Sequence, residues 1–285
     1  MNAPLVSQVG GKRSPSIGHE YMLYQALIGA WPGAVDADFS ARMQAYALKA
    51  AREAKQETSW NVPDPAYEEA LQGFVGRLLD AEVSARFLES FAAFAARTTL
   101  LGALNSLSQL ALKALTPGVP DFYQGTEFWD LSLVDPDNRR PVDFGMRRRE
   151  LADERRDWQR ITADWPDGRI KLALTRELLK LRRDYADVFQ QGSYEQLAVT
   201  GPHAEHVIAF TRTLKRRRLV VAIGRHFGPL TDGGRQWPSQ WDGMVEPETA
   251  GTFEHLIGGE PGQRTKRLSL AELFRDFPVS VLRGI

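Results

Sequence analysis

The chain has 285 residues, enough to bury a core in one or two domains. Its 36 basic residues balance 36 acidic ones, so the formal net charge is zero and no charged tail indicates nucleic acid or an anionic membrane as a partner. The chain has no cysteine, which excludes disulfides and thiolate metal sites and fits a reducing, cytoplasmic setting. We expect neither a membrane span nor a signal peptide, because the sequence lacks apolar runs of the required length and position.

The first part of the chain predicts a flexible segment followed by helices. Residues 1–18 are rich in Gly, Ser and Pro, so we expect a flexible lead-in. Residues 19–116 show helical spacing of apolar positions. The first helix carries Tyr21, Leu23, Tyr24, Leu27 and Ile28 and is expected to stop at Trp31-Pro32-Gly33.

Further helices follow within this region. A longer, charged helix is expected over 39–58, and Asp64-Pro65 predicts the start of another, because proline is favoured in the first turn. Apolar residues from Phe87 to Leu115 continue one helical face, a pattern typical of a core.

The segment after these helices combines an apolar run with a polar loop. Residues 117–124 include Val119, Phe122 and Tyr123 and predict one buried strand. Helices are then expected near 147–159 and 170–183.

The C-terminal region, 189–285, changes to short β runs. Segments at 194–197, 206–211 and 219–223 are separated by Gly-Pro, Asp-Gly-Gly and Gly-Gly breaks. This pattern predicts a small antiparallel β-sandwich, so the fold class is α+β with more than one domain.

The polar loop is the most informative part of the sequence. It reads DPDNRRPVD from Asp135 to Asp143, and the prolines at 136 and 141 stiffen it because they fix φ. A stiff loop with three carboxylates, an amide and two guanidiniums suits a polyhydroxylated ligand. The alternative is a surface network of Asp–Arg pairs that satisfy one another.

Several motifs together resemble one enzyme family. PGVPDFYQGTE at 117–127 is similar to a stretch on the eighth barrel strand of the α-amylase family, and the DPDNRRPVD loop is similar to the loop that follows it in maltooligosyltrehalose synthases. HEYMLYQALIGAWP at 19–32, KAAREAK at 49–55 with Thr58-Ser59-Trp60, and the segment 270–282 also resemble these synthases. The matches extend in order over nearly the whole chain.

The resemblance implies a fold and an activity. It places the last strand and helices of an α-amylase-type (β/α)8 catalytic barrel at 117–188, after a helical subdomain at 19–116 that includes the last barrel helices. It implies a synthase that isomerises the reducing-end α-1,4 linkage of maltooligosaccharides to an α,α-1,1 linkage. This intramolecular transglucosylation belongs to trehalose biosynthesis and needs no cofactor.

The catalytic groups of that family are missing from this sequence. Glycosyl transfer needs paired carboxylates, one to attack and one to protonate the leaving oxygen. The family motifs that carry them do not occur here, and Gly76–Asp80 has the wrong spacing for one of them. We therefore expect the chain to begin after the third catalytic carboxylate, to run to the natural end, to hold no catalytic residue and to be inactive alone. The rest of the parent barrel would be its partner. The alternative is a non-catalytic glucan-binding or structural module.

The resemblance also implies substrate-binding residues. In the polar loop these would hold sugar hydroxyls: Asp135, Asp137, Asn138, Arg139 and Arg140. Gln124 and Glu127 would support the end of the eighth strand. Lys49 and Arg52 lie in a segment that borders the active-site cleft in the synthases; the alternative for both is a solvated helix face with i,i+4 pairs.

The histidines and a run of arginines are predicted to have structural roles. His19 and Glu20 are expected to be exposed residues that cap a helix start. His203 and His206 have no third ligand nearby, so no metal site is expected. Arg216–Arg218 follow Lys215 and predict a solvated hairpin tip.

Overall fold

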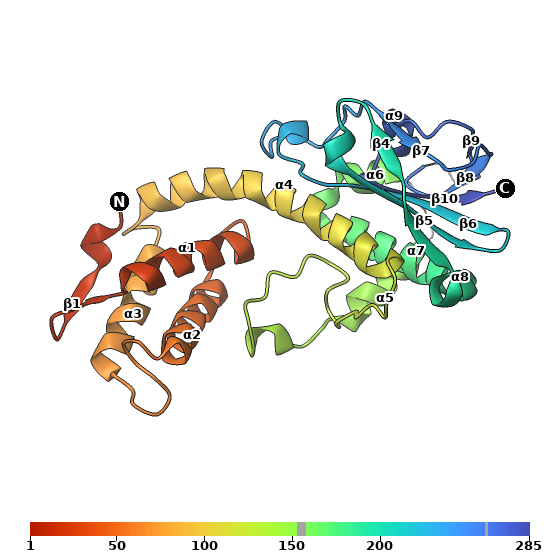
Figure 1. Cartoon of the computed structure of the whole chain (residues 1–285). Helices are drawn as coiled ribbons and strands as arrows, with labels where there is room; N and C mark the ends of the chain where they lie inside the picture. Colours follow the sequence, from red (N-terminus) through yellow and green to blue (C-terminus); the bar gives the residue numbers. More distant parts are fainter. Residues whose placement is uncertain (153–157, 260–261) are drawn as a thin grey trace. The chain divides into compact units, whose positions relative to one another are not determined.

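The computed structural model describes residues 1–152, 158–259 and 262–285 (Figure 1). The chain divides into two compact units: residues 1–99 with 131–141, and residues 100–130 with 142–285. The helix α4 (Ala85–Leu115) contributes residues to both units. The domain boundaries expected at residues 116 and 188 remain predictions.

The first unit is a helical body. Its helices are α1 (Ile17–Ala30), α2 (Ala37–Ala54), α3 (Pro65–Leu78) and the first half of α4. Each of α1, α2 and α3 starts at a capping side chain, Ser16, Asp36 and Asp64, which accepts a hydrogen bond from the amide three residues on. The predicted helix start at Asp64-Pro65 is thereby confirmed. The helices enclose a core whose fully buried side chains include Leu23, Leu27, Phe39 and Phe74.

The N-terminal segment differs from the flexible lead-in that we expected. A 3-10 turn (Ala3–Leu5) is followed by the antiparallel pair β1 (Ser7–Val9) and β2 (Lys12–Ser14). Gly10 and Gly11 link the strands with φ of 54° and 78°, a backbone that glycine adopts without strain and that suits a two-residue hairpin. Ser14 is fully buried, and its hydroxyl donates to the Tyr67 carbonyl at 3.1 Å. The glycines make a tight turn here rather than a mobile tether.

The second unit is built on a six-stranded antiparallel sheet. Its strands in spatial order are β3 (Ser193–Gln196), β5 (Val207–Leu214), β6 (Arg217–Gly224), β10 (Val279–Gly284), β8 (Phe253–Ile257) and β9 (Arg264–Thr265). Three of the strands overlap the predicted segments at 194–197, 206–211 and 219–223. β5 and β6 form a hairpin closed at Leu214 and Arg217, with Lys215 at φ 55°, which confirms the predicted hairpin tip.

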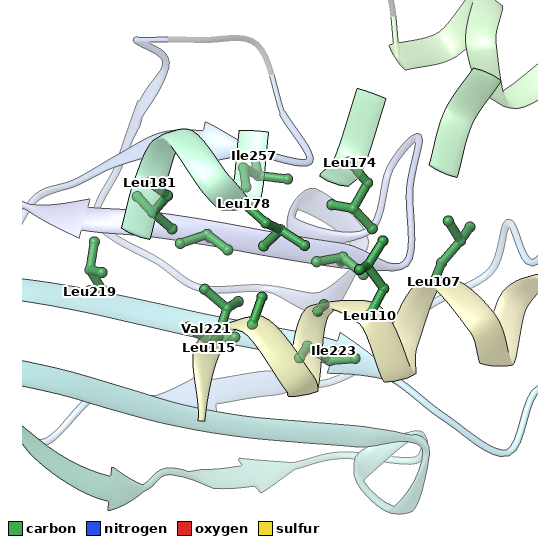
Figure 2. Close-up of a cluster of buried hydrophobic side chains, with 14 of the residues drawn as sticks. Leu107, Leu110, Leu115, Leu174, Leu178, Leu181, Leu219, Val221, Ile223 and Ile257 are labelled. Atoms are coloured by element: carbon green, nitrogen blue, oxygen red, sulfur yellow. The ribbon is translucent and has the colours of Figure 1, made fainter. Parts of the chain in front are cut away.

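The central strands β6 and β10 are buried on both faces of the sheet. Successive side chains of a strand point to opposite sides, so each of these strands contributes to two hydrophobic clusters. Figure 2 shows leucines of α4 and of α7 (Arg169–Asp184) gathered with Leu219, Val221 and Ile223 of β6. The alternate residues of β6, Val220 and Ala222, belong to a second cluster with Trp241, Phe253 and Phe274.

Short elements complete the second unit. A two-stranded sheet pairs β4 (Ala198–Thr200) with β7 (Met244–Glu246), and α8 (Ala186–Gln191) and α9 (Leu270–Leu273) are single short helices. The antiparallel character of the C-terminal region is confirmed, while its classification as a sandwich stays a prediction.

The helices expected after the polar loop are found in part. α7 covers the predicted helix at 170–183. The helix predicted at 147–159 corresponds to α5 (Phe144–Ala152) and α6 (Trp158–Ala163). Residues 153–157 of that prediction lie outside the described residues.

The buried strand predicted at 117–124 is absent from the described residues. This segment is without regular structure until a turn at Gln124, and Val119 is 99% exposed. A barrel strand is held by backbone hydrogen bonds to parallel neighbours on both sides. All strand pairs of the described residues are antiparallel, and none includes residues 117–124, so the local apolar pattern is not sufficient to make a strand.

The helix α4 is long and apolar enough to cross a membrane by length and composition alone. It also supplies buried side chains to hydrophobic clusters, among them Phe91 in the first unit and Leu104 and Leu107 in the second. One part of the helix surface therefore takes part in the packing of the protein interior.

Candidate functional site

A contact between Asp137 and Arg42 of α2 anchors the polar loop within the first unit. Its carboxylate accepts hydrogen bonds from Arg42 Nε and Nη2 of α2, both at 2.8 Å, and from the Leu133 amide at 2.7 Å. Arg42 also donates to the Leu131 carbonyl at 2.9 Å. Because the Arg42 guanidinium holds the loop at two places, residues 131–137 have a defined course.

The Arg42–Asp137 contact changes the acidity of both groups. Burial acts to raise the pKa of Asp137, but hydrogen bonds from Arg42 and the Leu133 amide outweigh it, so that pKa lies below its ordinary value. The hydrogen bond to Asp137 raises the pKa of Arg42. Both groups therefore stay ionised.

Beyond the anchor, the loop presents exposed polar side chains. Asp137, Asn138 and Arg139 form a single 3-10 turn, and Asn138 is exposed. The side chain of Arg139 is 71% exposed and pairs with Asp135. The Nε atom of Arg140 lies 3.2 Å from Oδ1 of Asp137, and its Nη1 atom lies 3.8 Å from Oδ2 of Asp38 on α2. An amide and two guanidiniums of this kind can donate several hydrogen bonds to hydroxyl groups.

The expected contributors on α2 are engaged in local contacts. Lys49 pairs with Glu53 at 3.0 Å, an i,i+4 pair on the helix surface. Arg52 donates to both carboxylate oxygens of Glu68 on α3, at 2.8 and 2.6 Å. This hydrogen bonding lowers the pKa of Glu68 and raises the pKa of Arg52. Arg52 is therefore fixed as a link between two helices.

Gln124 and Glu127 belong to the second unit, whereas the loop residues 135–140 belong to the first. Glu127 accepts from Arg147 Nε at 2.7 Å and from the Gly125 amide at 3.1 Å. Arg147 in turn donates to the Gly125 carbonyl at 2.7 Å. Glu127 thus holds the turn in which the exposed Gln124 lies.

The two residues expected to cap α1 have other roles. Ser16 provides the cap, and its hydroxyl accepts from the His19 amide at 3.3 Å. The His19 ring is buried and lies 3.0 Å from the Tyr67 hydroxyl. Burial lowers the pKa of His19. Glu20 pairs with Arg13 of β2 and accepts from the Tyr24 hydroxyl at 2.6 Å. The prediction of two exposed capping residues is wrong, because Tyr67 of α3 contacts His19 and Arg13 of β2 pairs with Glu20.

The other two histidines singled out earlier have protein partners. His203 Nδ1 accepts from the Asp242 amide at 2.8 Å, and His206 Nδ1 lies 3.0 Å from the His226 carbonyl. Among the described residues, no group of three or more His, Cys, Asp or Glu side chains is placed to hold a metal ion.

Two residues of this region were missed in the sequence. Arg42 lies in a helical stretch with several other charged residues, and nothing local distinguishes it from them. Trp60 was noted only within a motif, yet it is 57% exposed beside the Arg52–Glu68 pair.

Comparison with known proteins supports the resemblance of the motifs. No protein-family model matches the sequence. A candidate maltooligosyl trehalose synthase of Mycobacterium tuberculosis (strain H37Rv) is 36% identical over 268 residues, which is 91% of this chain and 31% of that protein.

Solved structures give the same result. Maltooligosyltrehalose synthase from Arthrobacter ramosus matches with a TM-score of 0.73 at 34% identity, over 93% of this chain and 32% of that one. A hypothetical maltooligosyl trehalose synthase from Sulfolobus tokodaii matches with a TM-score of 0.68 at 28% identity, again over 93% of this chain and 32% of its own. The chain is thus a relative of the maltooligosyltrehalose synthases and spans about one third of the length of those it matches.

Proposed function

We propose that this chain is the C-terminal portion of a maltooligosyltrehalose synthase. The observation that carries the proposal is the similarity to these synthases over nine-tenths of the chain. The complete enzyme would move the reducing-end glucose of a maltooligosaccharide from an α-1,4 to an α,α-1,1 linkage. In that reaction a carboxylate of the parent barrel would attack the anomeric carbon next to the reducing-end glucose, while an acid protonates the O4 oxygen of that leaving glucose. The anomeric hydroxyl of the freed glucose would then attack the same carbon and release the carboxylate.

The role of the polar loop in this reaction would be to hold the reducing-end glucose. Asn138, Arg139 and Arg140 are exposed and can donate to sugar hydroxyls, while the Arg42–Asp137 contact holds the loop beneath them. A glucose that must turn without escaping to water needs an enclosed pocket with several directed hydrogen bonds. Asp135 would orient Arg139, and Lys49 and Arg52 would lie along the border of the same pocket. Gln124 and Glu127 would support the turn at residues 124–127.

Catalysis would need the rest of the parent barrel. The sequence of this chain carries none of the family motifs that supply the nucleophile and the acid. The isolated chain is therefore expected to bind sugar without converting it. The reaction needs no cofactor, and the parent enzyme would act in the cytoplasm.

Incubation of the purified chain with maltopentaose tests this proposal. No maltooligosyltrehalose should form from the chain alone, and product should form when the remaining two-thirds of the relative from Arthrobacter ramosus is added in trans. Chromatography measures the product, and an assay of reducing ends measures the loss of the free anomeric centre. Clear product from the chain alone would contradict the assignment of catalysis to the missing part.

A second candidate function is a non-catalytic glucan-binding or structural module, favoured by the missing carboxylate motifs. Sugar binding by the chain without product in any complemented mixture would support this alternative. Product in the complemented mixture would support the synthase.

A further inference from the structure

Trp60 is an exposed aromatic residue on a rigid loop. Its side chain is 57% exposed, although tryptophan is usually largely buried in folded proteins. It lies in the first unit between α2 and α3, just after the end of α2 at Ala54.

Hydrogen bonds hold the loop around Trp60 in one conformation. The Ser59 amide donates to the Val62 carbonyl at 3.1 Å, and the Val62 amide donates to the Ser59 hydroxyl at 2.9 Å. The buried Thr58 hydroxyl donates to Glu68 at 2.6 Å and accepts from the Asp64 amide at 3.0 Å. Hydrogen bonds therefore hold the backbone both before and after Trp60.

The indole ring itself is positioned from one side. The guanidinium carbon of Arg52 lies 4.8 Å from the centre of the ring, a cation–π geometry. Arg52 cannot easily leave, because both of its hydrogen bonds to Glu68 are short and charged. One face of the indole is therefore covered, and the exposed fraction of the side chain lies on the remaining surface.

A rigid aromatic face of this kind binds flat, partly apolar ligands at a small entropic cost. The axial C–H groups of a glucose ring form such a face, and the ring hydroxyls around it need polar partners. The exposed Asn61 follows Trp60 directly, and Lys55 and Gln56 are exposed where the loop begins.

We propose that Trp60 is a stacking platform for a glucose ring of a maltooligosaccharide, with Arg52 as the positioning residue behind it. The identity of the sugar rests on the proposed function. Under this proposal Arg52 contributes to binding through the indole ring, whereas the resemblance implied direct contact with the sugar.

Titration of the 285-residue chain with maltopentaose tests the platform directly. The indole N–H resonance of Trp60 is assigned by its loss in Trp60→Ala and followed to a sugar concentration of tens of millimolar, enough for about millimolar affinity. The chemical shift of this resonance should change as sugar is added, and the change should saturate. Trp60→Ala should weaken binding by about tenfold, because the contact area of one sugar face is lost, and Trp60→Tyr should retain part of the affinity.

Tyr21→Ala provides the matched control, because Tyr21 is also an exposed aromatic residue of the first unit, at 65% exposure. It should leave the affinity unchanged. Circular dichroism and denaturant unfolding check that each variant is folded.

Three results would overturn the platform: no shift of the Trp60 resonance, equal affinity of wild type and Trp60→Ala, or equal weakening by Tyr21→Ala. Loss of association with the complementing barrel portion, without loss of sugar affinity, would assign Trp60 to a protein contact instead. Each of these outcomes leaves the synthase proposal intact, because that proposal is decided by product formation.

Discussion

Arg42 and Asp137 are 95 positions apart in the chain and share two hydrogen bonds of 2.8 Å between guanidinium and carboxylate. Both side chains are largely buried. This contact holds residues 131–141, which include most of the polar loop, against α2. The loop that carries most of the proposed substrate contacts is thus held by Arg42, a residue that lies in none of the family motifs.

Breaking this contact should destabilise the first unit. Asp137→Asn leaves the Arg42 charge without its carboxylate, and we expect the free energy of unfolding to fall by about 2 kcal/mol. Denaturant unfolding measures the change, and hydrogen exchange at the Leu133 amide should speed up. Arg139→Ala removes an exposed pair and is the control, with an expected change within about 0.5 kcal/mol. Equal effects of the two substitutions would show that Asp137 is not the anchor.

In a full-length synthase that carries this sequence, substitutions of the exposed loop residues should affect only the kinetics, whereas substitution of Asp137 should affect kinetics and stability. Arg139→Ala and Asn138→Ala should each lower kcat/KM by about tenfold while the unfolding midpoint stays constant, because both side chains are exposed. Asp137→Ala should lower turnover and stability together. Unchanged kinetics for Arg139→Ala and Asn138→Ala would assign the exposed part of the loop to a structural role.

Buried His255 of β8 should make the second unit sensitive to mild acid. Neither ring nitrogen has a hydrogen-bond partner among the described residues, and burial lowers its pKa. Glu272 opposes this shift and Arg275 adds to it. Because the folded state binds the proton less readily than the unfolded state, stability is complete above about pH 6.5 and falls as the pH drops below it.

Substitution can isolate the contribution of His255. Unfolding free energies between about pH 7.5 and 5 should show a slope of at most about 1.4 kcal/mol per pH unit for one proton. His255→Leu should reduce that slope, with buried His19 contributing part of the remainder. His226→Asn is the control, because His226 is exposed and its φ of 53° is tolerated by asparagine. A slope unchanged by His255→Leu would exclude this residue as its source.

Arg212 should be a large contributor to the stability of the second unit. This buried arginine of β5 donates to the carbonyls of Leu115 at 3.2 Å, Phe189 at 3.1 Å and Ser193 at 3.1 Å, without a carboxylate partner in these bonds. These carbonyls lie at or just beyond the C-terminal ends of α4 and α8, where a cation is stabilised. Arg212→Met should lower the free energy of unfolding by about 3 kcal/mol, whereas exposed Arg216→Ala should change it by less than about 0.5 kcal/mol. Thermal or denaturant unfolding of both variants checks this.

Local sequence rules were sufficient for several elements. Asp64 followed by Pro65 predicted the start of α3, and the apolar spacing from Ile170 predicted α7, because caps and helical periodicity act within a few residues. The short β runs at 206–211 and 219–223 likewise predicted the strands β5 and β6. The family motifs predicted the relationship that the comparisons bear out.

Contacts between distant residues were not accessible in this way. The apolar run at 117–124 predicted a strand, but a strand needs partners that no local pattern provides. His19 was expected to be exposed, but it is buried and lies against Tyr67, 48 positions along the chain. Two glycines at 10 and 11 were interpreted as flexibility although a tight hairpin turn uses the same residues.

The caps, the helical and strand periodicity and the relationship to the synthases could be read from the sequence, since these depend on neighbouring residues and on motif identity. The contact of Arg42 with Asp137 and that of Arg212 with the ends of two helices join residues far apart in the chain, so only packing selects these arginines from many that look alike in sequence. Arg52 is close to Trp60 in the chain, but its position behind the indole depends on its hydrogen bonds to Glu68 of another helix.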